Sequence, residues 1–294
     1  MDYPRLFQLS VLIFAALPTT AFAHHDAGTA FSSPELWLVV LLATSAIAYG
    51  LGVARLWQKA GIGRGIRTAE AVRFVAGWTT LAAALLSPID GLAERSFALH
   101  MFEHELLMVV AAPFLVLSRP LEAWAWALPQ GIRRALAVGL SIPRLRFAWR
   151  RLTSPVSAWS CHALALWIWH VPILFVAALA SEALHVLQHT CFFASALAFW
   201  WAAFGRGFRT PDTTSVAMLF TTMLHTSALG LLLTFAPTPW YARGASGLFG
   251  FTALEDQQFG GLVMWVPGGI SYLIAVLVVV SAWLSSSHVG DRVG

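Results

Sequence analysis

The sequence predicts an all-α fold, a polytopic membrane helical bundle with seven transmembrane helices behind an N-terminal signal peptide. First, 58% of the 294 residues are hydrophobic and only 11% are charged, whereas soluble domains carry about 25% charged residues. Second, apolar runs of about twenty residues, the length that crosses a bilayer, recur along the chain. Third, the basic residues gather in alternate connections between these runs, as they do in membrane proteins.

Residues 1–23 are expected to be a secretory signal peptide that is removed. Arg5 precedes the apolar stretch Leu6–Leu17, and small alanines flank Phe22 just before the expected cleavage point. The alternative is that this segment is retained as an uncleaved first helix. The small residues at the cleavage point favour removal.

Cleavage would leave residues 24–34 as a periplasmic tail that begins with His24 and His25. A free amino group beside two imidazoles is a ligand set that suits copper. The alternative interpretation is a solvated tail that binds no metal.

The seven helices are expected to form one membrane domain, residues 35–284, followed by a short cytoplasmic tail at 285–294. Each span covers an apolar run of roughly twenty residues. The chain is therefore expected to be a multi-pass protein of the lipid bilayer. The spans are expected at residues 35–55, 69–88, 97–118, 156–178, 183–204, 214–236 and 260–284.

Basic residues predict the orientation of this bundle. With the mature N-terminus outside, the outer segments hold only Arg95 and Arg243, and the positive-inside rule is satisfied at every loop. This orientation places the mature N-terminus in the periplasm and the C-terminus in the cytoplasm of a bacterial inner membrane. The net charge of +4 is then explained by membrane topology, so nucleic acid is not an expected partner. The inner connections hold Arg55, Lys59, Arg64, Arg67, Arg73, Arg119, Arg133, Arg134, Arg144, Arg146, Arg150, Arg151, Arg206 and Arg209, with Arg292 in the tail.

The longest inner connection, residues 119–155, mixes tryptophan, leucine and arginine. This composition is typical of an amphipathic helix that lies in the membrane interface. We expect such a helix on the cytoplasmic side. A docking surface for a partner protein is the alternative interpretation of the same pattern.

Two pairs of histidines stand where an apolar run begins: His100 and His104 in HMFEH, and His185 and His189 in HVLQH. A spacing of four residues places both rings of a pair on one helix face, about 5–6 Å apart at Cβ. The two predicted helices run in the same direction, so both pairs lie within roughly 10 Å of the outer surface. Ionisable groups inside a bilayer are costly and usually functional. We expect a metal site in which the four imidazoles converge if the two helices are neighbours.

Further side chains are candidates for additional ligands or for groups that orient the ligands. His170 precedes Pro172, which should open the helix there. The Pro267-Gly268-Gly269 sequence predicts a kink in the last helix, and His162 is assigned no role. The further candidates are His170, His225, Glu103, Gln188, Glu255, Asp256, Met101, His24 and His25.

Imidazole donors suit copper, zinc and haem iron alike. A thioether facing the site, from Met101, Met108 or Met223, would favour copper(I). A closed tetrahedral site would favour zinc, and haem would need axial histidines on facing helices. HMFEH also matches the inverted zinc-protease motif, with Glu103 as the base. Gln188 stands at the equivalent point of the second pair and cannot act as a base. We therefore expect a binding protein for a metal or haem rather than an enzyme, assign no catalytic residue, and leave copper, zinc and haem open as the bound group.

Five segments, taken as an ordered set, resemble the CtaG-type cytochrome c oxidase assembly factors, which are polytopic bacterial membrane proteins. The resemblance covers roughly residues 70–284. The segments are HMFEHELLMVVAAPFLVL, WIWHVP, LHVLQHTCFFASALAFWW, TTMLHTSALGLLLTFAPTPWY and LEDQQFGGLVMWVPGG, of which the last is the most distinctive.

This resemblance implies that the acidic motif of the family falls on Glu255 and Asp256. Glu103 and Glu105 depart from the family pattern, which has glutamine at the first position and an apolar residue at the second. Two extra carboxylates could raise the affinity for a cation or tune the imidazoles. The family's histidine motifs fall on His100, His104, His170, His185, His189 and His225.

The resemblance also implies participation in building a haem–copper oxidase, with the oxidase subunits or its other assembly factors as partners. We expect the two histidine pairs to bind copper at the periplasmic side of the membrane and to hand it over. A membrane copper transporter, a b-type haem protein and a purely structural assembly scaffold are the alternatives.

Overall fold

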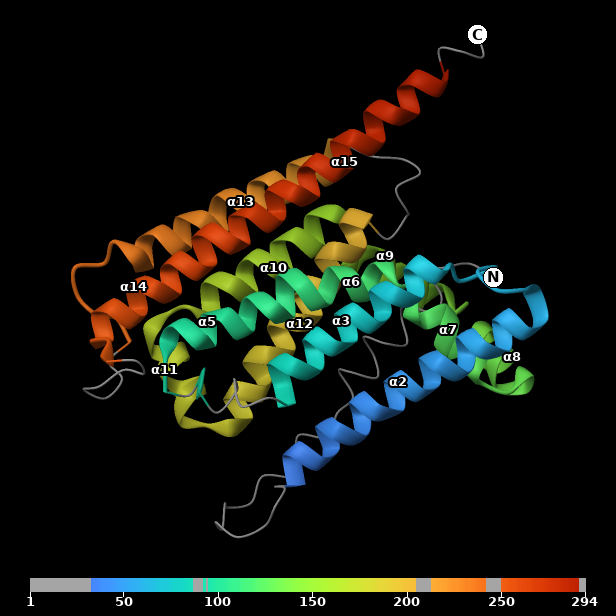
Figure 1. Ribbon diagram of the computed structural model, residues 1–294, viewed down its shortest axis with the longest axis horizontal. Coiled ribbons are helices and arrows are strands. Elements are labelled where there is room, and N and C mark those ends of the chain that lie inside the picture. The colour runs from blue at the N-terminus through green and yellow to red at the C-terminus, as the bar shows by residue number, and fades with distance from the viewer. Residues whose placement is uncertain (1–32, 87–91, 94, 205–212, 242–249, 291–294) are drawn as a thin grey trace. The chain divides into compact units, whose positions relative to one another are not determined.

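The computed structural model describes residues 33–86, 92–93, 95–204, 213–241 and 250–290 (Figure 1). The described residues form helices and turns and contain no strand, which confirms the all-α prediction. The expected signal peptide, His24 and His25 lie outside them. The described chain divides into two units, one of residues up to Ala82 together with Phe114–Leu152, the other of Ala83–Pro113 together with the residues from Thr153 onward.

In the first unit, α2 (Ser33–Ala60) packs along α7 (Pro120–Ala127). Gly52 permits this contact, because a Cβ atom there would lie 1.8 Å from the carbonyl oxygen of Ala123. The indole nitrogen of Trp124 also donates to the carbonyl of Ser45 at 2.9 Å. The unit further contains the main part of α3 (Thr68–Leu86).

The connection expected to hold one amphipathic helix holds three short helices, α7, α8 (Gln130–Gly139) and α9 (Pro143–Leu152). The single-helix prediction is wrong because prolines interrupt the segment. Proline lacks the backbone N–H that a helix interior needs, so it stands at the start of a helix instead. Both α8 and α9 carry arginines together with exposed apolar side chains, such as Val138 and Phe147. The amphipathic character of the segment is therefore retained.

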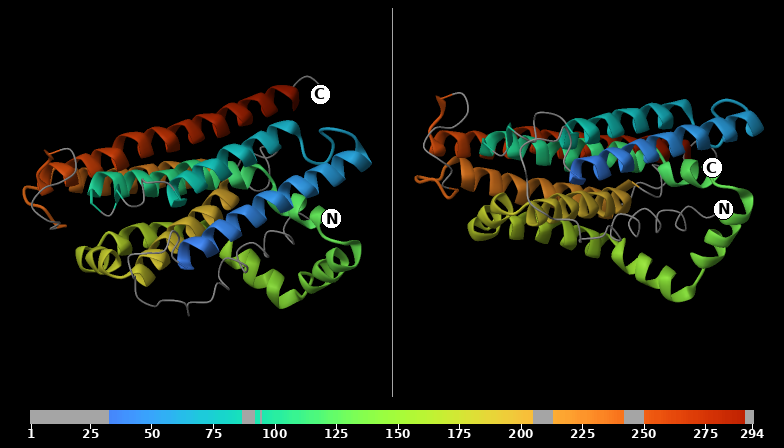
Figure 2. Two further views of the ribbon diagram at one scale, coloured as in Figure 1. Left: turned by 60° about the horizontal axis from the view of Figure 1, so that its bottom comes forward. Right: turned by 90° about the horizontal axis from the view of Figure 1, so that it is seen from below.

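The second unit contains the remaining helices. Within it α10 lies beside α12, α13 beside α14 and α15, and α5 against α14 (Figures 1 and 2). Two helical runs continue through π-helical turns, η1 and η3, so they count as single spans. The elements are α5 (Phe97–Glu105), η1 (Leu106–Ala111), α10 (Pro155–Trp169), α11 (Pro172–Ala180), α12 (Glu182–Phe204), α13 (Thr213–Thr234), α14 (Ala253–Val263), η3 (Met264–Gly268) and α15 (Gly269–Gly290). The helix α6 (Ala112–Leu117) follows η1, and the division between the units falls within it, after Pro113.

Six helices among the described residues are long and apolar enough to cross a membrane, or seven if the pair α10 and α11 counts as one span. The chain is a multi-pass membrane protein. The fourth predicted span, 156–178, is wrong as one helix, because its halves meet at 76°. The helix ends at Trp169 with His170 as its C-cap, and α11 restarts at Pro172. The break follows from the proline, as the sequence predicted.

The last span begins earlier than expected, at Ala253 rather than at residue 260. Thr252 and Glu255 form a capping box there, in which each side chain accepts from the other residue's backbone N–H. Pro267 lies within η3, so its missing N–H is accommodated by a π-helical turn. The helical run nevertheless counts as one span, Ala253–Leu284, across the position of the expected kink.

A buried cluster of apolar side chains fixes α5 to its neighbours and so positions the residues that follow. Gly260 of α14 allows close approach, because a Cβ atom there would lie 2.3 Å from Cδ1 of Phe97. The ring of Phe97 stacks on that of Tyr241 at a centroid distance of 4.7 Å. The cluster consists of Phe97, Met101, Phe175, Leu229, Leu233, Tyr241 and Met264.

Candidate metal centre

The first turn of α5 is held by a carboxylate from α14. Asp256 accepts hydrogen bonds from the hydroxyl of Ser96 and the backbone N–H of Phe97, both at 2.6 Å, and from the N–H of Ala98 at 3.2 Å. These bonds satisfy N–H groups that a helix start leaves without partners. Asp256 therefore fixes the position of α5, on which half of the candidate ligands lie.

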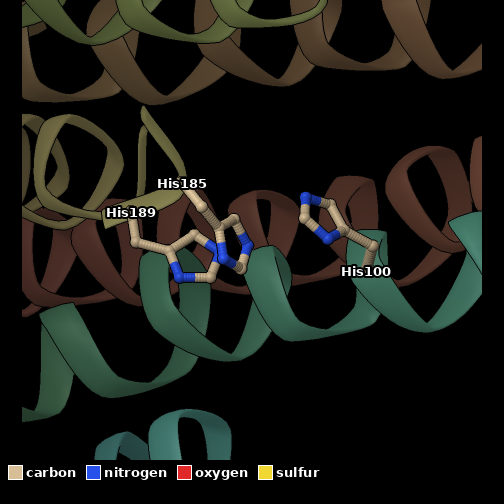
Figure 3. A group of neighbouring side chains, drawn as sticks. All are labelled: His100, His185 and His189. Carbon is tan, nitrogen blue, oxygen red and sulfur yellow. The ribbon is translucent and has the colours of Figure 1, made fainter. Parts of the chain in front are cut away.

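The four imidazoles of the two histidine pairs converge, which was expected only if the two helices were neighbours. The centroid of the His100 ring lies 5.3 Å from that of His185 and 5.8 Å from that of His189. His104 lies 5.1 Å from His189 by the same measure. His185 and His189 project from α12 toward His100 on α5 (Figure 3).

Three of these rings could hold one ion. His100, His185 and His189 each offer a ring nitrogen, and the three atoms lie within 4.8 Å of one another. We call this group the three-histidine position. Phenylalanine rings flank the histidines of α5: His100 packs against Phe175 at 5.1 Å between ring centroids, and the neighbouring His104 packs against Phe192 at 4.6 Å. Imidazole nitrogens at this separation suit copper or zinc.

The polar side chains around these rings are deeply buried. His104 is 1% exposed, and Glu103 and Gln188 are 0% exposed. Both ring nitrogens of His104 and both amide heteroatoms of Gln188 have no hydrogen-bond partner among the described residues. A buried polar group left unsatisfied costs about 1–3 kcal/mol. A cation or polar ligand bound here would offset that cost, so the donor set fits a metal.

Glu103 supplies the carboxylate of this cluster. Its Oε1 lies 3.7 Å from Nδ1 of His189, across the gap between α5 and α12. A carboxylate beside a histidine orients the ring and raises its basicity as a ligand. When ionised, Glu103 would also place negative charge next to a cation held by His189.

His170, at the break between α10 and α11, joins the same region. Its Nδ1 lies 2.6 Å from the carbonyl oxygen of Leu166, and its Nε2 lies 3.4 Å from Sδ of Met101. The hydroxyl of Tyr241 donates to the carbonyl of His170 at 2.6 Å. Burial raises the pKa of Tyr241, so this hydroxyl remains a donor at neutral pH. Tyr241 was not a candidate from the sequence, because its contact with His170 spans 71 positions.

Three of the sequence candidates lie outside this cluster. Glu255 is engaged in the capping box, and Asp256 holds α5. His225 packs against Trp159, with ring centroids 5.8 Å apart. In contrast His162, to which the sequence assigned no role, has both ring nitrogens in hydrogen-bond reach of hydroxyls, Ser195 at 3.1 Å and Tyr272 at 3.4 Å. No local motif could predict those partners, which are 33 and 110 positions away.

Comparison with known proteins assigns the chain to a family. No curated protein and no solved structure matches the chain. A sequence model of the cytochrome c oxidase caa3 assembly factors (Caa3_CtaG) matches residues 47–286, a range that includes both histidine pairs and the acidic segment of α14. The match covers well over half of the 294 residues. The chain belongs to the Caa3_CtaG family of cytochrome c oxidase caa3 assembly factors.

Proposed function

We propose that this protein supplies copper during assembly of a haem–copper cytochrome c oxidase, by binding the ion at the converging histidine pairs and releasing it to a partner. Family membership supports the role in oxidase assembly. One observation supports copper as the cargo: three imidazole nitrogens from two helices lie within 4.8 Å of one another in a buried setting. Neutral imidazoles are good ligands for copper and bind it reversibly.

The residues of the site would have different roles in binding and releasing copper. The three-histidine position would hold the ion, and Glu103 would balance its charge in a region of low dielectric. His104 and Gln188 have buried polar atoms that lack hydrogen-bond partners among the described residues, and these atoms would gain an interaction when the ion is present. Because each contact is exchanged for another during transfer, no bond in a substrate need be broken. The protein would act without turnover, as a carrier rather than an enzyme.

The charge pattern of the loops predicts the orientation of the protein in the membrane. With basic loops on the cytoplasmic side, the histidine pairs would open toward the periplasm of the bacterial inner membrane. Copper centres of an oxidase that are assembled from that side would be the destination. Oxidase subunits or other assembly factors would be the partners.

An assay in cells tests this role. The chain is replaced by a His100→Ala/His185→Ala variant in cells that make a haem–copper oxidase under limiting copper. We expect oxidase activity and its copper content to fall, and added copper to restore them in part. Phe102→Ala and Val186→Ala, on exposed faces of the same helices, are the matched controls and should leave the oxidase unchanged. Unchanged oxidase in cells that contain the histidine variant at the normal level would instead identify a structural scaffold and overturn the proposal.

A further inference from the structure

The proton arrangement of His170 is fixed by its surroundings. A carbonyl oxygen only accepts, so Nδ1, which lies 2.6 Å from the carbonyl of Leu166, must carry a proton and donate it. In the neutral ring Nε2 then keeps its lone pair. Histidines that ligate metals show the same arrangement, since their other ring N–H donates to a carbonyl or carboxylate. His170 is therefore oriented as a ligand.

The lone pair of His170 faces a sulfur atom. Nε2 lies 3.4 Å from Sδ of Met101, and a thioether accepts but does not donate. Both side chains are buried, Met101 at 0% and His170 at 4% exposure. Two acceptors in contact with no proton between them gain no hydrogen bond from each other. A soft cation would use both lone pairs at once.

His104 connects this pair to the three-histidine position. Its ring centroid lies 4.3 Å from that of His100 and 6.4 Å from that of His170. Both its nitrogens are buried and lack hydrogen-bond partners among the described residues. His104 therefore has donor atoms between the two groups, without a competing bond to the described part of the protein.

We propose that Met101 and His170, with His104 as third donor, form a soft position that selects copper(I), next to the three-histidine position. The inference rests on the proposed copper-handling function and adds an oxidation state and a second location for the ion. Thioether sulfur prefers copper(I), whereas zinc and copper(II) prefer nitrogen and oxygen donors. An ion could pass between the two positions by exchange of imidazole ligands, with His104 next to both groups, and no electron would be transferred.

X-ray absorption at the copper edge tests the soft position on the intact protein. Purified chain is loaded with copper(I) without oxygen, and the scatterers bound to copper are identified. We expect one sulfur in the average shell together with imidazole nitrogens. We also expect Met101→Leu to remove the sulfur signal, to lower the amount of copper(I) bound and to leave zinc(II) binding unchanged. Met108→Leu is the matched control, because Met108 is equally buried (2% exposed) on the same span. Exchange of methionine for leucine nearly conserves volume, so both variants should fold.

The outcomes separate this inference from the proposed function. Copper bound only through nitrogen or oxygen, with Met101→Leu equal to the wild type, would overturn the soft position and leave the histidine site standing. An absence of copper binding by the wild-type protein would overturn both. If Met101→Leu fails to fold, the spectrum of the wild type still shows whether sulfur is bound to copper.

Discussion

Glu103 and Gln188 occupy equivalent positions between the histidines of the two pairs, and both side chains are wholly buried. They have nearly the same shape but differ in charge. Glu103 lies 3.7 Å from a ring nitrogen of His189, so its charge would act directly on a cation held by that ring. Because of this difference, only one of the two pairs places a carboxyl group beside the candidate site.

Replacement of Glu103 by Gln tests this charge. Because a carboxylate behind a histidine ligand raises the basicity of the ligand and offsets the charge of the ion, we expect copper affinity to fall about 10–100-fold. The affinity is measured by competition with a chelator of known strength. Glu105→Gln is the control, since Glu105 is rotated roughly 200° around the helix and packs against Gly268 of η3. Equal losses in both variants, or none in either, would contradict the assigned role of Glu103.

At the scale of elements, the residue pattern located helices better than it located their interruptions. Apolar runs of transmembrane length were correctly predicted because burial in a bilayer needs a minimum length. The π-helical turns η1 and η3 were not predicted, because they depend on packing between helices and not on a local motif. The proline rule did predict the break beside His170. It could not predict that the two helices would meet at 76°.

For the acidic segment of α14, too, the sequence identified the residues but not their partners. In the sequence, Glu255 and Asp256 are acidic residues at the start of the last predicted helix. One interpretation was that they orient the metal ligands or attract the cation. The structure engages both carboxylates in hydrogen bonds at helix starts, Glu255 with Thr252 and Asp256 with the first turn of α5. The partners of Asp256 are about 160 positions away, so the sequence alone could not identify them.

Asp256→Asn should therefore act on stability. The variant keeps one acceptor but loses the charge that strengthens three hydrogen bonds to α5, so we expect the folded protein to lose roughly 1–3 kcal/mol. Thermal unfolding in detergent measures the loss. Glu255→Gln, at an exposed side chain, is the control and should lose less. A normal melting temperature for Asp256→Asn combined with loss of copper binding would show instead that Asp256 is a ligand.

At the scale of the whole molecule, the membrane class and the family were predicted from the sequence, which also contains the two histidine pairs. That the two pairs converge could be learned only from the structure. Helix spacing determines which residues share a face, but not which helix that face meets. The six spans found in the described part of the chain, or seven with the broken pair, agree with the prediction of a multi-pass bundle. The orientation with the histidine pairs toward the periplasm stays a prediction of the charge pattern.

Copper binding by the purified protein is the measurement that tests the central claim most directly. Wild-type chain, a His100→Ala/His104→Ala variant and a His185→Ala/His189→Ala variant are titrated with copper(I), and their visible spectra are recorded. We predict tight binding by the wild type, a loss of at least about 1.4 kcal/mol, or tenfold in affinity, in each variant, and no Soret band. Binding that survives in both variants would contradict the claim, and so would a wild type that carries haem instead of copper.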